Sequence, residues 1–370
     1  MINNKPTVAG FFVGCGGLDF GFQLAGFNLT WANEIDSDAA KSYKKLTGHD
    51  VIVDDVWNVL DNIPSTDIIV GGPPCQSFSL VGKRLEDDPR GELVFAYLKA
   101  IECSRPRAFV MENVPGLMAS KIDGVRLPLH LSSKFNELGY EVTILKLLAT
   151  DFFVPQKRQR VIMVGVRKGS KPFKLISSEQ YSKILGCPNL KLPITVSEAL
   201  DDLPTPLPKG SKDMAKYKSK PHSLYSKIMR EQGGGGVSLH SMPTMSLLDQ
   251  EFVKYIPPGG NYMNIPDSIS TKRIMSFKAT GGRTTTYGRL HPSRPAYTIN
   301  TFFNRPNVGA NYHHYEERLI TVREAMRLQS FPDYFEPYYS SQRSLHMQVG
   351  NAVPPLMARA IAESLKEIFE

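Results

Sequence analysis

The sequence has little cysteine and no long apolar run. Its four cysteines, Cys15, Cys75, Cys103 and Cys187, form no CxxC motif and no cluster with histidine. This spacing excludes a disulfide framework and offers no ligand set for a zinc ion or another metal. An apolar stretch of about 18 residues, which a membrane helix needs, is also missing. The first residues, MINNKPTVAGFF, lack the charged and then apolar order of a signal peptide. We therefore expect a cytoplasmic, monomeric globular protein without a membrane partner.

Length and composition are those of a globular enzyme. With 370 residues, the chain is long enough for one large domain and a smaller one. Its content of 41% hydrophobic and 22% charged residues is typical of globular proteins. Size and composition leave most classes of enzyme open.

Positive charge is concentrated in one middle segment. Between Lys168 and Leu290 there are 18 Lys and Arg residues against 9 Asp and Glu residues, whereas the whole chain has 44 against 36. The rest of the chain is therefore close to neutral. Such a bias occurs in an ordinary solvated surface and also in a face that binds a phosphate backbone. Charge alone does not choose between the two interpretations.

Short apolar runs alternate with amphipathic stretches from residue 7 to residue 167. The runs that predict strands are VAGFF, LTWAN, VIV, DIIVGG, RAFVMEN and RVIMVGV. Helical periodicity occurs at 18–25, 37–46, 92–103 and 128–138. Strands that alternate with helices are typical of the α/β class. We predict a doubly wound, mixed but mainly parallel sheet of the Rossmann-like kind.

The pattern changes after Gly169, where Pro, Gly, Ser and Lys become frequent, as in LPTPLPKGSKD and the run Gly233 to Gly236. This composition predicts a second, irregular domain or a flexible insertion. Regular structure returns near Leu319, where TVREAMRLQSF predicts a helix. The last stretch also predicts a helix, with one apolar face formed by Leu356, Ala360, Ile361, Leu365 and Ile368. We expect this C-terminal part to pack onto the first domain.

A glycine-rich turn, FFVGCGGLDFGFQLAGF, follows the first predicted strand. Gly14, Gly16 and Gly17 allow the backbone to approach a ligand closely at the start of a helix. Alone, the pattern is equally typical of a tight turn without a ligand. Glu34 follows the second strand about 20 residues later, where such folds place an acceptor for a ribose hydroxyl. Asp55 follows the third strand, where its partner could be an adenine amino group or only water.

Cys75 is the best candidate for a nucleophile. The segment DIIVGGPPCQSFS predicts a buried strand that ends in two glycines and two prolines, which hold this cysteine at the carboxyl edge of the sheet. Cysteine is usually a small buried hydrophobic residue, but the neighbours here are Gly, Pro, Gln and Ser. A free thiol with a pKa of about 8.5 is a few per cent thiolate at neutral pH and a strong nucleophile.

Two further strand ends carry polar residues. AFVMENVPGL places Glu112 and Asn113 at the same sheet edge, where partial burial would raise the pKa of Glu112 and suit it to act as an acid. VPQKRQRVIMVG places Gln156, Arg158 and Arg160 at the start of a strand, and a period of two directs both arginines to one face. Each motif alone is also typical of a capping acid or an ion-paired edge strand.

Together and in this order, the motifs resemble the cytosine-C5 DNA methyltransferases, in particular those of bacterial restriction–modification systems. PPCQSFS, ENV, QKRQR, RPAYTI with TVREAMRLQSFPD, and QVGNAVP carry the resemblance. It runs from Phe11 to about Gly169 and from Gly288 to the end, omitting the basic middle. It implies three parts: a catalytic and cofactor-binding domain at 1–169, a target-recognition domain at 170–315 and a C-terminal return at 316–370.

The resemblance also implies roles for single residues. Cys75 would be the nucleophile, and Glu112 the acid. Arg160 would contact the cytosine carbonyl and hold Glu112, with Arg158 beside it. The pocket for S-adenosyl-L-methionine would be formed by Phe12, Gly14, Cys15, Gly16, Gly17, Leu18, Glu34, Ile35, Asp55, Val56, Pro74, Leu93, Asn351, Ala352 and Val353. DDPRGELVF resembles a loop that closes over the flipped base, and the residues implied at the DNA there are Gln76, Ser79 and Arg90.

One position departs from the pattern. The family usually has an acid two residues before the aromatic residue of the glycine turn, and this sequence has Gly10 there. The difference puts in doubt a buried hydrogen bond that supports the turn, although not the turn itself.

The implied activity is transfer of a methyl group from S-adenosyl-L-methionine to carbon 5 of a cytosine in double-stranded DNA. The cytosine must leave the duplex to reach the nucleophile, while the basic segment would bind phosphates and read bases. The candidates for base contacts are Arg230, Arg273, Arg283 and Thr284 to Thr286. The recognition sequence does not follow from these residues. A restriction endonuclease of matching specificity is expected from the family alone.

Three other interpretations stay open. A DNA-binding relative without activity is disfavoured because Cys75, Glu112, Arg160 and the cofactor turn occur together. A tRNA-methylating relative of the same fold is disfavoured by the basic insert of about 120 residues, which suits a duplex-reading domain better. A nicotinamide enzyme would use the glycine turn but leaves PPCQ, ENV and QKRQR without a purpose.

Overall fold

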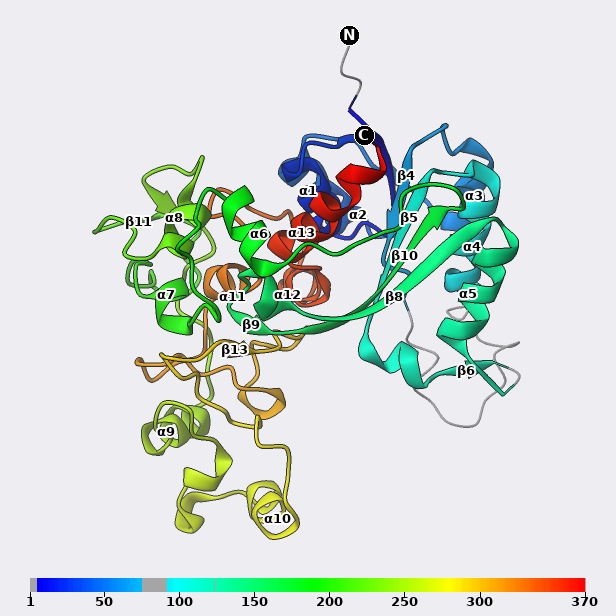
Figure 1. Ribbon diagram of the computed structural model, residues 1–370. Coiled ribbons are helices and arrows are strands. Elements are labelled where there is room, and N and C mark those ends of the chain that lie inside the picture. The colour runs from blue at the N-terminus through cyan, green and yellow to red at the C-terminus, as the bar shows by residue number, and fades with distance from the viewer. Residues whose placement is uncertain (1–4, 75–91, 123, 370) are drawn as a thin grey trace.

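The computed structural model describes residues 5–74, 92–122 and 124–369, and its centre is a seven-stranded sheet (Figure 1). The strand order is β3-β2-β1-β4-β5-β10-β8. β10 runs antiparallel to both of its neighbours, and the other six strands point in one direction. The strands are β1 (Thr7–Phe11), β2 (Asn28–Glu34), β3 (Ile52–Val53), β4 (Ile68–Gly71), β5 (Ala108–Asn113), β8 (Tyr140–Leu148) and β10 (Gln159–Arg167).

The strand order reverses between β1 and β4. The chain first adds β2 and β3 on one side of β1 and then returns to add β4 and β5 on the other side. Phe11 of β1 pairs in register with Gly71 of β4, so the carboxyl ends of these two strands lie side by side. Open α/β sheets bind their ligands at such a switch point. The glycine turn and the segment that leads to Cys75 both begin there.

Helices cover both faces of the sheet, because strands with apolar residues on both sides must be buried on both. Val8 of β1 packs into one core with α1, α2 and α13, while Ala9 and Phe11 pack into another with α3, α4 and α5. None of the helices in the described residues is long and apolar enough to cross a membrane. The bounds are α1 (Gly17–Leu24), α2 (Ser37–Thr47), α3 (Val56–Val59), α4 (Glu92–Ser104), α5 (Leu127–Glu137) and α13 (Pro355–Leu365).

The predicted α/β sheet is confirmed, and its elements lie close to their expected places. The helices α1, α2, α4 and α5 each begin and end within one residue of the expected range. All six expected strands occur. The seventh, β8, was not predicted. It lies at the edge of the sheet and its middle residues are only half-buried, so its sequence YEVTILKLL does not alternate clearly between apolar and polar.

The middle of the chain forms short elements, as its Pro and Gly content predicted. Residues 245–290, which we call the small lobe, form a hydrophobic core around Phe252, Ile274 and Tyr287, to which Tyr312 and Leu319 also belong. The lobe lies at the bottom of Figure 1, away from the sheet. The elements of this middle part are α6 (Ser178–Ile184), α7 (Val196–Leu200), β11 (Ala215–Lys216), α8 (Leu224–Arg230), β12 (Gly236–Val237), α9 (Leu247–Tyr255), α10 (Lys272–Thr280) and β13 (Ala296–Tyr297).

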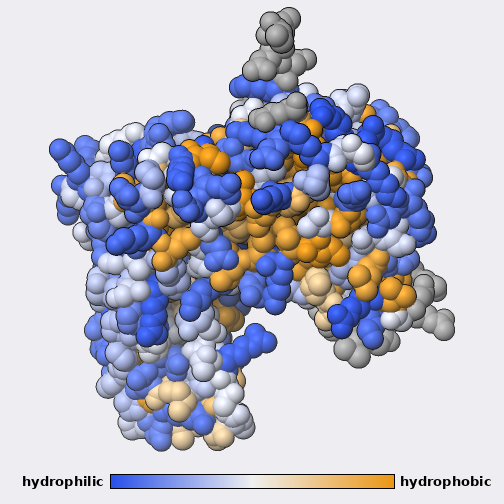
Figure 2. Space-filling view, viewed as in Figure 1, coloured by the Kyte–Doolittle hydropathy of each residue, from blue (hydrophilic) through white to orange (hydrophobic). Residues whose placement is uncertain are grey.

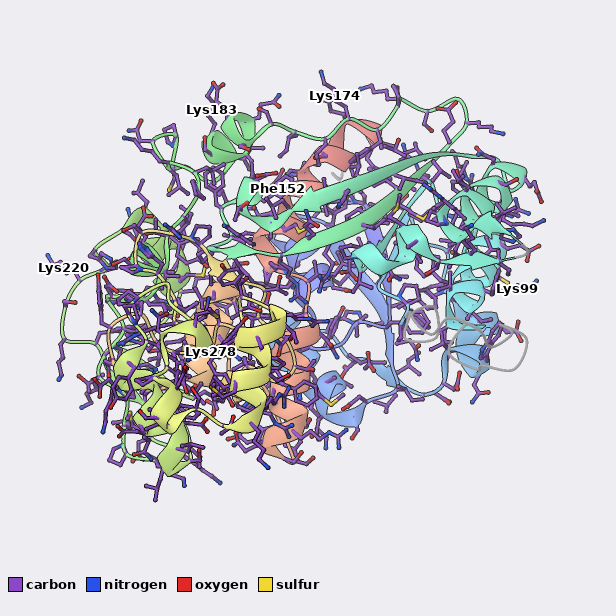
Figure 3. All side chains as sticks on the ribbon, turned by 90° about the horizontal axis from the view of Figure 1, so that it is seen from below. Lys99, Phe152, Lys174, Lys183, Lys220 and Lys278 are labelled. Atoms are coloured by element: carbon purple, nitrogen blue, oxygen red, sulfur yellow. The ribbon has the colours of Figure 1, made fainter. Side chains whose placement is uncertain are left out.

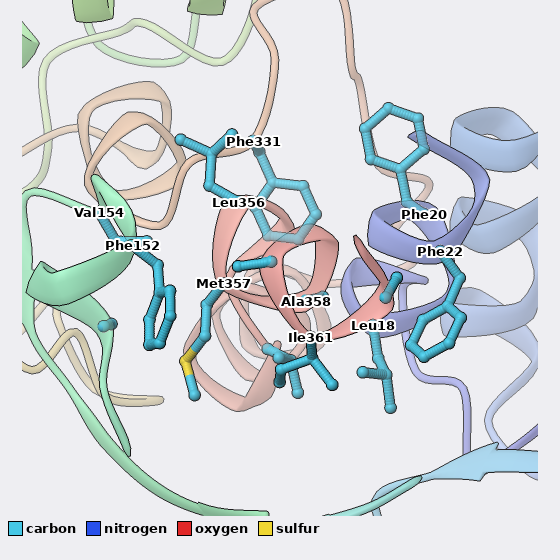
Figure 4. Close-up of a cluster of buried hydrophobic side chains, with 14 of the residues drawn as sticks. Leu18, Phe20, Phe22, Phe152, Val154, Phe331, Leu356, Met357, Ala358 and Ile361 are labelled. Carbon is cyan, nitrogen blue, oxygen red and sulfur yellow. The ribbon is translucent and has the colours of Figure 1, made fainter. Parts of the chain in front are cut away.

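The C-terminal helices return to the sheet domain. α11 (Val322–Leu328) and α12 (Gln342–Asn351) precede α13, which packs closely on α1. A Cβ at Gly21 of α1 would lie 2.3 Å from the Cβ of Ala358 in α13. Figure 4 shows side chains of both helices in one buried cluster, among them Leu18 and Ile361. The first and last helices of the chain therefore share one core.

A buried ion-pair network joins α11 to the loop after α7. Arg327, with no exposed side-chain surface, pairs with Asp202 at 2.7 Å and with Asp333 at 2.5 Å. The Tyr225 hydroxyl donates to the carbonyl oxygen of Arg327. A buried charge is tolerated only when it is paired and hydrogen-bonded. This network fixes the middle part of the chain to the C-terminal helices.

Candidate active site

The glycine turn lies at the carboxyl end of β1, at the switch point. Gly16 is the N-cap of α1 and has φ 96°, a conformation that favours glycine. A Cβ at Gly17 would lie 2.1 Å from the carbonyl oxygen of Val353. Gly14, in contrast, has no atom within 4 Å of its Cβ position. The turn is thus closely covered by the C-terminal segment on one side and open at Gly14, where a ligand can reach the backbone.

Two residues near this opening are Phe12, which precedes the turn, and Glu34, which bonds Gly14. Phe12 is half-buried and has φ 52°, a strained conformation for a residue with a side chain and one that occurs at ligand sites. Glu34 ends β2, and its carboxylate accepts hydrogen bonds from the backbone N–H groups of Gly14 at 2.8 Å and Asp36 at 2.9 Å. Burial raises the pKa of Glu34, and these two donors oppose the rise. The carboxylate is therefore fixed beside the turn.

Large apolar side chains stand uncovered after β2 and β3, which are neighbours in the sheet. Ile35 is 68% exposed and Trp57 is 44% exposed, whereas Val56 is buried. Asp55 is the N-cap of α3, and its carboxylate accepts from the N–H of Trp57 at 3.0 Å. Exposed apolar side chains of this size suit the face of a flat ring. Sequence reasoning did not select Trp57, although its position two residues after Asp55 was a usable signal.

Gly10 has no side chain because Asp19 occupies the space. A Cβ at Gly10 would lie 1.9 Å from Oδ1 of Asp19. Asp19 belongs to α1, is 1% exposed and accepts a hydrogen bond from the Tyr43 hydroxyl at 3.1 Å. Burial raises the pKa of Asp19 to about 7. A buried acid thus lies beside Gly10, but it comes from α1 and bonds Tyr43, and sequence reasoning did not select it.

Glu112 and Asn113 end β5 beside the segment that leads to Cys75. The side-chain amide of Asn113 donates to the carbonyl oxygen of Pro73 at 3.0 Å. A Cβ at Gly72 would lie 3.0 Å from Oε2 of Glu112, so this glycine makes room for the carboxylate. Cys75 itself lies outside the described residues. The two residues of the ENV motif thus hold and contact the chain two and three residues before the expected nucleophile.

The two arginines of QKRQR have different partners. Nε of Arg160 forms an ion pair with Oε1 of Glu112, and both side chains are nearly buried. The guanidinium of Arg158 is 1% exposed and donates instead to the carbonyl oxygens of Ile299 at 2.8 Å and Gly350 at 2.7 Å. The expectation that both arginines converge from one face is not met. Arg158 lies in the break between β9 (Gln156–Lys157) and β10, where the period of two is interrupted. Its hydrogen bonds to Ile299 and Gly350 connect the segment between β9 and β10 to the C-terminal part of the chain.

A cleft of about 640 Å³ opens beside Arg160. Figure 2 shows an open hollow between the small lobe and the sheet domain. Clefts of this volume are typical of sites for small molecules and cofactors. The lining residues are Pro115, Leu148, Lys157, Gln159, Arg160 and Thr298.

The segment after α12 covers the glycine turn. Asn351 is exposed, Ala352 is half-buried and Val353 is buried against the turn. The Cys15 thiol donates to the carbonyl oxygen of Gln348 at 3.5 Å. Burial raises the pKa of Cys15 to about 12, so this thiol is unreactive.

Three other expected cofactor residues differ in exposure. Pro74 is exposed and Leu93 is half-buried, so both have surface available to a ligand. Leu18 is 5% exposed, and its side chain packs in the core between α1 and α13. The expectation for Leu18 therefore holds at most for its backbone, because its side chain is directed into the protein.

The expected DNA contacts also divide. Gln76, Ser79 and Arg90 lie outside the described residues. Arg230 does not fit its expected role, because its guanidinium pairs with Asp202 at 2.6 Å and stacks on Tyr217. In the small lobe, the expected residues with exposed side chains are Arg273, Arg283 and Thr284.

A solved structure shows which class of protein has this fold. A prophage-encoded protein of E. coli, whose crystal structure is described as a DNA modification methyltransferase, matches the chain with a TM-score of 0.74. The two share 25% sequence identity, and the match covers 99% of each chain. The fold is that of a methyltransferase.

Sequence comparison identifies the family. The model of the C-5 cytosine-specific DNA methylases matches residues 7–367. The type II methyltransferase M.NgoFVII of Neisseria gonorrhoeae is 32% identical over 99% of this chain and 88% of its own length. M.DdeI of Desulfomicrobium norvegicum is 30% identical over 98% of this chain and 89% of its own length. The chain belongs to this family and is a DNA (cytosine-5-)-methyltransferase.

Proposed function

We propose that the protein uses S-adenosyl-L-methionine to methylate a cytosine that has left the DNA duplex, within a specific double-stranded sequence. The position of Glu112 carries this proposal. Its carboxylate occupies the space beside Gly72, three residues before Cys75, and forms an ion pair with Arg160 at the wall of the cleft. An acid, a guanidinium and the approach to a thiol thus meet at one sheet edge.

The residues at the switch point fit S-adenosyl-L-methionine, the methyl donor of the family. Gly14 leaves free space where a side chain would stand, and the Glu34 carboxylate bonded to the Gly14 N–H can also accept from a ribose hydroxyl. Ile35 and Trp57 offer uncovered apolar surface for an adenine ring. When bound, the donor supplies an electrophilic methyl group on a sulfonium. Phe12, strained and half-buried, lies between the turn and the end of β1.

The chain's own residues then make carbon 5 of the cytosine reactive. The Cys75 thiolate forms a bond to carbon 6, the electron pair of the 5,6 double bond forms a 4,5 double bond, and the pair released from the 3,4 double bond moves to ring nitrogen 3. Glu112 donates a proton toward ring nitrogen 3. Arg160 keeps Glu112 in place and faces the cytosine carbonyl. Carbon 5 then takes the methyl group, the sulfonium leaves as a thioether, and the proton on nitrogen 3 returns to Glu112. A base removes the proton on carbon 5, the 5,6 double bond forms again, and the carbon–sulfur bond to Cys75 breaks, which restores the thiolate.

A flipped cytosine suits the cleft beside Arg160. A base inside a duplex cannot be reached by a side chain, and extruding it costs a few kcal/mol. The cleft has a volume of about 640 Å³, and an open hollow separates the small lobe from the sheet domain. We propose that the duplex lies in this hollow and that the small lobe reads its sequence.

Restriction–modification is the proposed biological setting. M.NgoFVII and M.DdeI are both named as type II methyltransferases. By this proposal, the protein marks host DNA and a restriction endonuclease of matching specificity cuts DNA without the mark. Bisulfite sequencing of DNA from a host that expresses the gene identifies the marked sequence.

Methyl transfer and covalent trapping test the proposal. We expect the protein to transfer label from S-adenosyl-L-methionine to duplex DNA and to form an adduct with DNA that contains 5-fluorocytosine. Cys75→Ala should abolish both results, since the nucleophile is lost, and should leave binding of the donor largely intact. Cys103→Ala serves as the matched control and should behave as the wild type.

The same assay separates the other interpretations. Label in tRNA and none in DNA would support a tRNA-methylating enzyme and contradict the proposal. No transfer to either substrate would indicate a DNA-binding relative without activity. An adduct that persists in Cys75→Ala would show that another residue is the nucleophile.

A further inference from the structure

One segment of the chain connects the cleft beside Arg160 with a second pocket. Thr298, which lines the cleft, follows β13 directly, and Asn304, which lines the second pocket, lies six residues further along. The second pocket has a volume of about 240 Å³. In Figure 1, β13 lies between β9 and the helices of the small lobe. We call residues 298–308 the connecting segment.

Hydrogen bonds to its backbone hold the connecting segment in one shape. Near its start, the N–H of Ile299 donates to Oε1 of Gln156 at 2.8 Å, and the carbonyl oxygen of Ile299 accepts from Arg158 at 2.8 Å. Near its end, the carbonyl oxygen of Arg305 accepts from the side-chain amide of Asn311 at 2.7 Å. A segment that is fixed at both ends can present its side chains to a ligand in a defined geometry.

The middle of the segment has one buried anchor between exposed residues. Phe303 is 1% exposed, and its ring packs edge-on against His346 of α12 with the ring centroids 4.7 Å apart. Phe302, Asn304 and Arg305 are exposed. The guanidinium of Arg305 lies over the ring of Phe302, 5.0 Å from its centroid. Stacking of this kind orients a guanidinium and uses none of its N–H donors.

The second pocket lies where the connecting segment meets the small lobe. Tyr287 belongs to the core of the lobe and also lines the pocket. Its backbone N–H donates to the carbonyl oxygen of Pro306 at 2.7 Å, and its φ is 52°. Such a conformation is strained for an aromatic residue and is frequent at ligand sites. The lobe and the connecting segment therefore build the pocket together.

The walls of the pocket combine donors and acceptors with balanced charge. Arg305 contributes N–H donors, and the amides of Asn304 and Asn307 can both donate and accept. Asp249 contributes a carboxylate, whose Oδ2 accepts from the Ser246 hydroxyl at 2.6 Å. A carboxylate repels a phosphate group, whereas the edges of bases carry the donors and acceptors that Arg, Asn and Asp side chains bind. The pocket thus suits bases better than the DNA backbone.

We propose that Arg305 and Asn304 read base edges of the duplex near the flipped cytosine. An arginine binds O6 and N7 of a guanine with two hydrogen bonds, and an asparagine binds N6 and N7 of an adenine in the same way. Six residues of extended chain span at most about 20 Å, and stacked base pairs are about 3.4 Å apart, so the bases lie within about six base pairs of the methylated cytosine. This inference rests on the proposed use of duplex DNA and names residues that read its sequence.

The test compares single base-pair changes in a duplex that the protein methylates. After bisulfite sequencing has identified such a site, each base pair within about six of the cytosine is replaced in turn, and kcat/KM is measured. For the wild type, replacement of one G·C pair and of one A·T pair should each lower kcat/KM about tenfold or more. Arg305→Gln should lower kcat/KM on the intact site and lose the dependence on that G·C pair. Asn304→Ala should lose the dependence on the A·T pair.

The control removes one positive charge at a distance, as Arg305→Gln does in the pocket. Lys99 of α4 lies at the edge of the sheet domain, far from Lys278 of the small lobe in Figure 3. Lys99→Gln should keep the wild-type dependence on every base pair. Circular dichroism and binding of S-adenosyl-L-methionine show whether each variant is folded.

The possible outcomes separate the two proposals. A wild-type dependence on every base pair in both Arg305→Gln and Asn304→Ala would overturn the inference. A uniform loss on all duplexes would also overturn it, because these residues would then contact phosphates. If the wild-type protein methylated no duplex at all, the proposed function itself would be contradicted.

Discussion

Glu112 has the neighbours that a placed acid requires. It lies next to Arg160 across the β5–β10 pair and next to Gly72 at the approach to Cys75. The distance between the side chains of Glu112 and Arg160 is set by the strands, since Glu112 pairs in register with Ile162 of β10. The site residue is thus fixed by regular structure rather than by a loop, which favours an accurate geometry.

Replacing Glu112 by Gln keeps the shape and removes the proton. We expect Glu112→Gln to lower kcat by about 10² or more, the usual contribution of a placed general acid. Donor binding should remain, and quenching of the exposed Trp57 by S-adenosyl-L-methionine is a convenient measurement, because the other tryptophan, Trp31, is buried. Glu141→Gln, an exposed position on the edge strand β8, is the control. A wild-type kcat in Glu112→Gln would remove Glu112 from the mechanism.

At single residues, the sequence predicted residue types better than partners. The ordered motifs selected Glu112 and Arg160, and the structure places them together. The same motif gave no sign that Arg158 binds backbone carbonyls, because its partners at Ile299 and Gly350 come from remote segments. Arg230 shows the same limit, since only the fold brings Asp202 and Tyr217 to it.

At the scale of elements, three of them meet at one buried carboxyl group. Asp19 of α1 fills the space beside Gly10 of β1 and accepts from Tyr43 of α2. The sequence predicted these three elements accurately, because their periodicity is strong. It could not predict this contact, because a glycine in a strand does not reveal which side chain fills the space beside it. The burial of the Asp19 carboxyl group is therefore known only from the packing of the three elements.

Asp19 should make stability depend on pH. Its pKa is raised from 3.8 to about 7 by burial, so between these values the folded protein keeps a proton that the unfolded chain releases. Stability from this group is therefore lost as pH rises toward about 7 and is lowest above it. In Asp19→Asn this loss is absent. Urea unfolding at several pH values measures the effect. The free energy of unfolding of the variant should rise relative to that of the wild type, by at most a few kcal/mol, as pH rises from about 4 to about 8.

A second variant distinguishes this effect from a general loss of packing. The Tyr43 hydroxyl bonds the Asp19 carboxylate and lowers its pKa against the larger effect of burial. Tyr43→Phe should therefore move the pH range of the wild-type loss upward. Parallel stability curves for wild type and Asp19→Asn at all pH values would contradict the raised pKa.

On the scale of the whole molecule, the small lobe stands apart from the sheet, with a hollow between them (Figures 1 and 2). Its core around Phe252 and Ile274 is separate from the cores of the sheet. The sequence predicted a basic, irregular part here, but not which arginines it leaves exposed. Arg289 is buried by three backbone carbonyls, whereas Arg273 and Arg283 are exposed. The carbonyl oxygens that bind Arg289 belong to loops without periodicity, so no sequence pattern predicts them.

We expect Arg273 and Arg283 to contribute to recognition of the target sequence. Each Arg→Gln variant should weaken binding to an unmethylated duplex that contains the recognition sequence by about 1–3 kcal/mol, the usual contribution of an arginine that reads a base. Binding to a mixed-sequence duplex should change much less. Lys254→Gln, whose cation is already paired with Glu251 in the same lobe, is the control. Equal weakening on both duplexes would assign these arginines to phosphates instead.

The packing of α13 on α1 has a consequence for synthesis. The glycine turn is among the first residues to be made, but the segment at Val353 and the helix that cover it are among the last. A nascent chain therefore carries the proposed nucleophile, the proposed acid and the turn without the C-terminal segment that covers the turn. Methylation should begin only when translation is nearly finished, and a product of premature termination before Pro355 should be inactive rather than partly active.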